Sequence, residues 1–131
     1  MTTMERFLPV LSTVQVRLRE ILTRNEEYML SWDLAKIRSL GENLIELAGD
    51  VYPQLVQVEH RVLCASLREA GLGIIHRTAT AQKRQTAEED KEYFRNVHEV
   101  LGAICRKIET GEYYQALLKV STNRAKENYI L

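Results

Sequence analysis

The stretch FLPVLSTVQVRLREILTRNEEYMLSW, residues 7–32, decides the fold class of this chain. Large side chains recur along it at alternating steps of four and three residues, which places them on one face of an α-helix. These positions are Phe7, Leu11, Val14, Leu18, Ile21, Asn25, Tyr28 and Trp32. Further apolar residues beside this stripe make it broader than the seam of a two-stranded coiled coil, which is typical of a helix in a bundle. We therefore predict a long amphipathic helix over residues 4–30.

A second apolar stripe begins at Leu30 and ends at Val51, out of phase with the first. On one continuous helix the two stripes would point about 200° apart, because each residue turns the helix by about 100°. A turn near residues 31–33 explains the change of phase more simply. We predict two helices, over residues 4–30 and 33–49, packed as a hairpin, with a single continuous helix as the alternative.

Glycine and proline divide the middle of the chain. Gly49 indicates the end of the second helix, and Pro53 is typical of the first turn of a third. Gly71 resembles a C-terminal glycine cap of that third helix. Residues 71–86 have two interpretations, a frayed helical extension or a flexible connection, because glycine and threonine weaken helix propensity there.

Two more helices are expected towards the C-terminus. Thr86 and Glu89 form a capping box, which predicts a helix start. A last helix is expected over residues 112–126. Together these patterns predict an all-α protein, a four- to five-helix up-and-down bundle with a long N-terminal amphipathic helix and a single domain over residues 1–131.

Composition narrows the function classes. Eighteen basic and eighteen acidic residues cancel, whereas proteins that bind nucleic acid or anionic membranes usually carry a basic excess. No apolar run approaches the roughly 20 residues of a membrane span, and no signal-peptide pattern is visible at the N-terminus. The two cysteines have no disulfide-scaffold spacing. We expect a cytoplasmic protein.

The histidines and cysteines give little support for metal or catalytic chemistry. His60 and Cys64 are four residues apart on one predicted helix and could share a metal ion, but Cys64 is better explained as a small buried side chain. No histidine follows a glutamate at the spacing that di-iron bundles use. We expect no enzyme activity, no cofactor and no metal, and keep a metal or small-ligand site in the bundle as the weaker alternative.

A segment without acidic residues, from position 70 to 87, carries four basic side chains: His76, Arg77, Lys83 and Arg84. Such a segment can bind phosphate, nucleic acid or an acidic partner, although it holds no aromatic residue for base stacking. A solvated basic loop is the alternative interpretation.

The end of the first stripe is the candidate partner site. Asn25 places a polar side chain at a core position, which in coiled coils sets register and partner number. In a monomeric bundle the same residue is explained by a layer that solvent reaches or by a hydrogen bond to a loop. Tyr28, Met29 and Trp32 follow within two turns, and such residues are enriched at interface cores. We therefore expect a non-enzymatic interaction module, an adaptor, regulator or assembly subunit, that pairs through its N-terminal helix with itself or with another protein.

Overall fold

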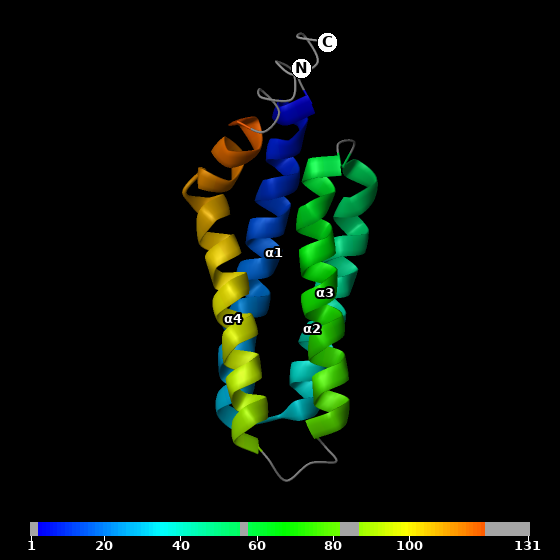
Figure 1. Ribbon diagram of the computed structural model, residues 1–131, viewed down its shortest axis with the longest axis vertical. Coiled ribbons are helices and arrows are strands. Elements are labelled where there is room, and N and C mark those ends of the chain that lie inside the picture. The colour runs from blue at the N-terminus through cyan, green and yellow to red at the C-terminus, as the bar shows by residue number, and fades with distance from the viewer. Residues whose placement is uncertain (1–2, 56–57, 82–86, 120–131) are drawn as a thin grey trace.

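The protein is an antiparallel bundle of helices, seen in a computed structural model that describes residues 3–55, 58–81 and 87–119 (Figure 1). Its long helices are α1 (Thr3–Ser31), α2 (Leu34–Val51), α3 (Val58–Ala81) and α4 (Ala87–Glu109), and the short 3-10 helix η1 (Tyr52–Gln54) follows α2. Residues 112–119 are also helical. Consecutive long helices run in opposite directions, and the described residues form no strand. The prediction of an all-α up-and-down bundle is confirmed.

The turn between α1 and α2 confirms the predicted hairpin and excludes one continuous helix. Trp32 has a positive φ of 51°, which stops α1. Its N–H donates to the Met29 carbonyl, and the N–H of Asp33 donates to the Tyr28 carbonyl. The Asp33 carboxylate then accepts from the backbone N–H of Lys36 as the N-cap of α2.

The predicted end of the second helix at Gly49 is wrong by two residues. α2 continues to Val51, whose side chain is buried, and the N–H of Tyr52 still donates to the Ala48 carbonyl. Pro53 lies in η1 and not in the first turn of α3, which begins at Val58. The regular helix ends before Pro53 because proline has no N–H to donate.

The predicted glycine cap at Gly71 is also wrong, because α3 continues through it to Ala81. Gly71 lies where α3 crosses α2, and a Cβ there would come within 2.6 Å of the Gly41 carbonyl oxygen. The glycine therefore permits close helix packing instead of ending the helix. Residues 71–81 are helical and not a flexible connection, while residues 82–86 lie outside the described residues.

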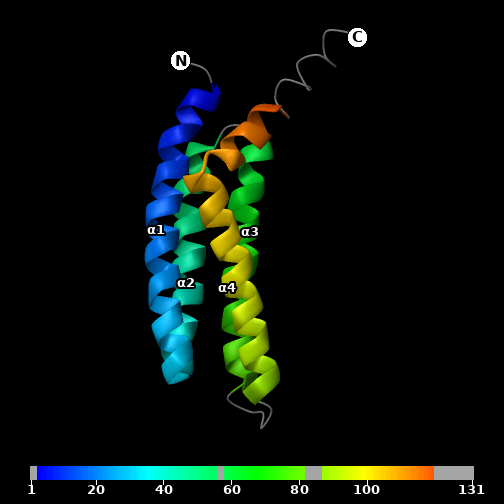
Figure 2. The ribbon, with the colours of Figure 1, turned by 90° about the vertical axis from the view of Figure 1, so that its left-hand side faces the viewer.

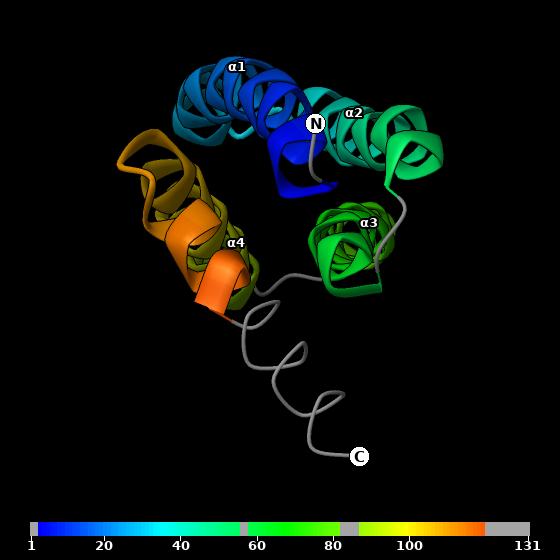
Figure 3. The ribbon, with the colours of Figure 1, turned by 90° about the horizontal axis from the view of Figure 1, so that it is seen from above.

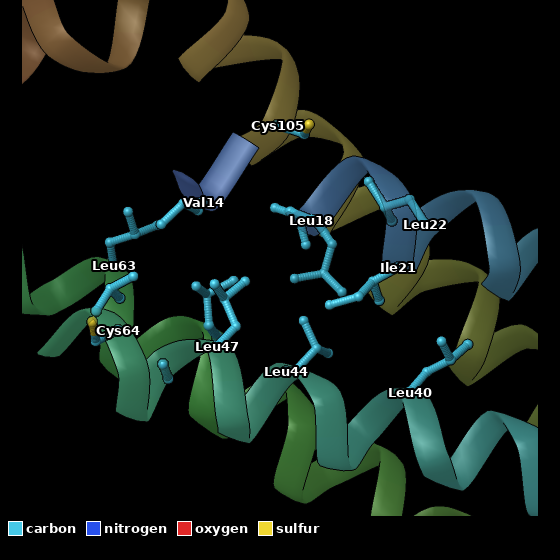
Figure 4. Packing of buried hydrophobic residues seen from close by; sticks show 14 of the residues in the cluster. Val14, Leu18, Ile21, Leu22, Leu40, Leu44, Leu47, Leu63, Cys64 and Cys105 are labelled. Carbon is cyan, nitrogen blue, oxygen red and sulfur yellow. The ribbon is translucent and has the colours of Figure 1, made fainter. Parts of the chain in front are cut away.

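The four long helices pack in the order α1, α2, α3, α4 around a shared apolar interior (Figures 2 and 3). Leu18 of α1 and Leu44 and Leu47 of α2 point towards one another at its centre (Figure 4). α4 begins with three acidic residues in its first turn, as the capping pattern predicts, although Thr86 itself lies outside the described residues. The predicted last helix is described only as far as residue 119, and residues 120–126 also lie outside.

Candidate functional site

A groove lies where the end of α1 meets the start of α4, at the lower end of the bundle in Figure 1. It has a volume of about 590 Å³ and takes Met29, Leu30 and Trp32 from α1 and its turn. α4 supplies Lys91, Arg95 and His98. Two of the predicted partner-binding residues, Met29 and Trp32, therefore line one groove. We call this the α1–α4 groove.

Leu30 is the most exposed large apolar side chain among the described residues, with 90% of its surface open to solvent. It follows Met29 directly, and Met29 packs against the core. Sequence reasoning assigned Leu30 to the second apolar stripe and missed its exposure. The exposure arises because Leu30 is two residues out of phase with the buried stripe of α1, so its side chain points away from the core.

Trp32 and Tyr28, the aromatic residues at the end of α1 and in the following turn, are held by contacts with other side chains of the bundle. The Trp32 ring meets the Phe94 ring edge-on with 5.8 Å between centroids, and the Lys91 ammonium lies 5.4 Å from the Trp32 centroid. Tyr28 is half-buried against the core, and the Lys36 ammonium lies 5.4 Å from its ring. Edge-to-face and cation–π attraction thus hold Trp32 at the rim of the groove, while Tyr28 is held outside the groove lining.

The side chain of Asn25 contacts other residues inside the bundle. Its side chain is buried, and its amide nitrogen lies 3.0 Å from His98 Nδ1 across the α1–α4 interface. The same amide contacts the Met29 sulfur at 3.2 Å. Of the four predicted partner-binding residues, Asn25 is therefore the one that its own bundle covers, and its polar group is satisfied by α4.

The imidazole of His98 joins Asn25 to the rim of the groove. His98 Nε2 lies 3.4 Å from the Glu26 carboxylate, whose side chain is exposed. Asn25, His98 and Glu26 thus form a chain of three polar side chains, of which His98 and Glu26 line the groove. Sequence reasoning did not pair these residues, because His98 is far along the chain on another helix.

The predicted basic cluster is only partly placed by the structure. Arg77 donates from Nε to Asp90 Oδ1 at 2.7 Å, and its guanidinium lies 5.0 Å from the Tyr93 ring centroid. The Asp90 side chain is 2% exposed, so this ion pair connects α3 to α4 at a buried carboxylate. His76 is exposed on α3, and Lys83 and Arg84 lie outside the described residues. One of the four predicted anion-binding residues thus already has a carboxylate partner.

His60 and Cys64 have packing roles. The His60 ring is 1% exposed and stacks on Phe7, with 3.9 Å between ring centroids and 10° between planes. Burial lowers the pKa of His60 and raises the pKa of Cys64, so the uncharged forms of both are favoured. Within the described ranges, no group of three histidine, cysteine or acidic side chains is arranged to hold a metal ion.

Cys105 is fully buried in α4 beside an ion pair. Its sulfur lies 3.5 Å from a carboxylate oxygen of Glu109, which also accepts two hydrogen bonds from Arg19 of α1. Burial raises the pKa of this thiol more than the nearby Arg19 lowers it. The reactive thiolate is therefore disfavoured at neutral pH.

A second groove, of about 770 Å³, lies between the outer faces of α2 and α3. Ala48 and Gly49 line it on α2, with Ala65 and Leu72 on α3. The Arg61 guanidinium lies at one edge, 5.1 Å from the Tyr52 ring centroid. We call this the α2–α3 groove. The sequence analysis did not identify it, because it depends on how closely the two helices approach.

Comparisons with protein-family models, with curated proteins and with solved structures found no match for this chain. In the part of the chain that the structure describes, none of the helices combines the length and the apolar character needed to cross a membrane. A function must therefore be proposed from the surfaces described above.

Proposed function

We propose that this protein is a non-enzymatic helical interaction module that binds an amphipathic helix of another protein in the α1–α4 groove. The observation that carries the proposal is the exposure of Leu30 beside Met29 and Trp32. Exposed apolar side chains next to a groove are typical of protein-binding sites, whereas isolated ones scattered over a surface are not. An amphipathic helix laid in such a groove anchors itself through side chains one turn apart.

The preformed rim supports binding. Trp32 is held by Phe94 and Lys91, and Met29 packs against the core, so neither side chain has to be ordered when a partner arrives. A site that is ordered before binding loses less conformational entropy on association. Leu30 is the exception, and covering it supplies apolar burial on binding.

Arg95 favours an acidic group on the partner, although the groove also carries the carboxylates of Glu26 and Glu88. Among the described residues, no carboxylate lies within ion-pair distance of the Arg95 guanidinium, whose Nε donates only to the Lys91 carbonyl. Lys91 is 4.0 Å from Glu88, whose side chain is almost fully exposed. A carboxylate on the partner helix would meet Arg95, while its apolar residues would meet Leu30 and Met29.

The experiment is a comparative affinity capture from an extract of the source cells. The tagged protein is compared with Leu30→Asp and with Val16→Asp, a matched control that changes an exposed valine on α1 outside the groove. We expect one protein in stoichiometric amount with the wild type and with Val16→Asp, and its loss with Leu30→Asp. Circular dichroism verifies that both variants remain folded.

A second measurement uses the captured protein after purification. Arg95→Glu is expected to weaken its binding by about tenfold or more, because reversal places two like charges together. Capture that is equal for Leu30→Asp and the wild type, or no stoichiometric partner in any sample, would contradict the proposal.

A further inference from the structure

The outer face of α3 carries exposed apolar side chains in a regular row. Val58 is 65% exposed and Val62 is 58% exposed, and Ala65 and Leu72 are exposed further along the helix. With Glu69 they form a row spaced by alternating steps of four and three residues, which lies on one face of the helix. The outer face of a bundle helix is normally polar, so this face differs from the usual pattern. We call it the α3 outer face.

The middle of this face borders the α2–α3 groove. Ala65 lies at its centre, and Ala48 and Gly49 face the same groove from α2. A Cβ placed on Gly49 would meet nothing within 4 Å, so the space beside it is open. Small residues at a crossing point allow two helices to approach closely, and larger side chains on both sides then interdigitate.

Two pairs of side chains on the α3 outer face are complementary about Ala65, whereas the pair three residues before and after it is Val62 and Arg68. Val58 and Leu72 lie seven residues before and after it, and both are apolar. Arg61 and Glu69 lie four residues before and after it, and their charges are opposite. In a two-fold contact between identical chains, each residue meets a second residue of the other copy and the same pair occurs twice.

We propose that two copies of this protein associate through the α3 outer face, with the two α3 helices antiparallel and the two-fold axis beside Ala65. Val58 then packs against Leu72 of the second copy. Arg61 forms an ion pair with Glu69 of the second copy, and the symmetry generates this pair twice. The two Ala65 residues meet at the axis, where their small size permits close approach.

The charges favour a second copy in the antiparallel orientation. In the described ranges, neither Arg61 nor Glu69 lies within ion-pair distance of an oppositely charged side chain of its own molecule; Arg61 instead donates to the Leu55 carbonyl and covers Tyr52. A parallel arrangement would place Arg61 against Arg61 and Glu69 against Glu69, which is unfavourable. The formal net charge of the chain is zero, so no overall repulsion opposes association.

Sedimentation equilibrium over a range from micromolar to millimolar protein tests this inference. The full chain is compared with Arg61→Glu, Glu69→Arg and the double variant that carries both changes. We expect a wild-type dimer, and each single reversal should raise its dissociation constant by about tenfold or more because like charges then meet twice. The double variant should recover the wild-type constant, because the two charges have only exchanged places.

Two controls separate this interface from the α1–α4 groove. Arg38→Glu reverses an exposed charge on α2 that does not line either groove and should leave the dimer unchanged. Leu30→Asp should also dimerise as the wild type does, and Arg61→Glu should still capture the partner of the α1–α4 groove. A wild type that stays monomeric at every concentration, or a double variant no better than the single ones, overturns the inference. Loss of dimer with Leu30→Asp but not with Arg61→Glu overturns it as well.

Discussion

Gly41 of α2 and Gly71 of α3 face each other where the two helices cross. A Cβ at Gly41 would lie 2.8 Å from the Gly71 carbonyl oxygen, and a Cβ at Gly71 would lie 2.6 Å from that of Gly41. Backbone cannot move aside as the end of a flexible side chain can. Because both residues are glycines, the two backbones can come into contact, and this contact sets the distance between α2 and α3. The same two helices form the α2–α3 groove.

Substitution of Gly71 by alanine should destabilise the protein by about 1–3 kcal/mol, because the added methyl group overpacks the crossing. In an open helical position the same change usually stabilises by about 0.5–1 kcal/mol. Gly49→Ala is the matched control, since Gly49 is helical and its Cβ would meet nothing within 4 Å. Urea unfolding measures both changes. Equal effects at the two glycines would show that the crossing does not restrict side-chain size.

Removal of the Arg77 guanidinium should cost about 1–3 kcal/mol, because Arg77→Ala leaves the buried Asp90 carboxylate without its ion pair, while Arg77 itself is partly exposed. Arg38→Ala is the control, since Arg38 pairs with Glu42 on an exposed helix surface, and it should change stability by less than about 0.5 kcal/mol. Chemical denaturation compares the two variants with the wild type. A similar small effect for both would mean that Asp90 finds another partner or water.

Acidification should destabilise the protein through His60. Burial lowers its pKa from the ordinary value of 6.5, so the unfolded state binds a proton first as the pH falls. The contribution of neutral His60 to the free energy of unfolding is complete above about pH 6.5. As the pH falls from there to the lowered pKa of the folded state, this contribution declines by at most about 1.4 kcal/mol per pH unit.

The free energy of unfolding, measured between about pH 7.5 and about pH 5, checks this prediction. His60→Gln should show a smaller slope than the wild type in that window. An unchanged slope in His60→Gln would rule out His60 as the cause.

Both thiols should react slowly with a disulfide reagent such as DTNB at slightly alkaline pH. Cys64 and Cys105 are buried, and burial raises the pKa of each thiol, so little thiolate is present or accessible. In denaturant, both of the chain's cysteines should react at once. A rapid native phase corresponding to one thiol would show that one of the two cysteines is accessible in solution, and Cys64 is the one that borders the α2–α3 groove.

Local patterns predicted most of the helices correctly. The change of phase at Leu30 predicted the hairpin because helix periodicity is a property of neighbouring residues, and Asp33 then caps α2 as such a residue should. The acidic residues before and at Asp90 predicted the start of α4 in the same way. The predicted helix end at Gly71 was wrong, because a glycine that ends a helix and a glycine that allows two helices to cross closely cannot be told apart from the sequence.

The candidate site could be predicted only in part. Met29 and Trp32 were identified from residue type and position, and both line the α1–α4 groove. The basic side of that groove was missed, because Arg95 and His98 meet α1 only after the bundle closes. Arg77 was assigned to a basic cluster on sequence proximity, while its actual neighbour is Asp90 on the next helix.

The stripe over residues 7–32 was enough by itself to determine a long amphipathic helix, because this follows from the spacing of apolar side chains along one segment. Together with the out-of-phase stripe from Leu30 to Val51 and the later helical patterns, the sequence also determined the hairpin and the all-α bundle. The tertiary structure alone decided which end of that stripe stays exposed, as at Leu30, and which polar residue is enclosed, as at Asn25. The exposure of a side chain and the partner of a polar group depend on the helices that pack beside it. The distance between those helices is set by contacts between residues far apart in the chain.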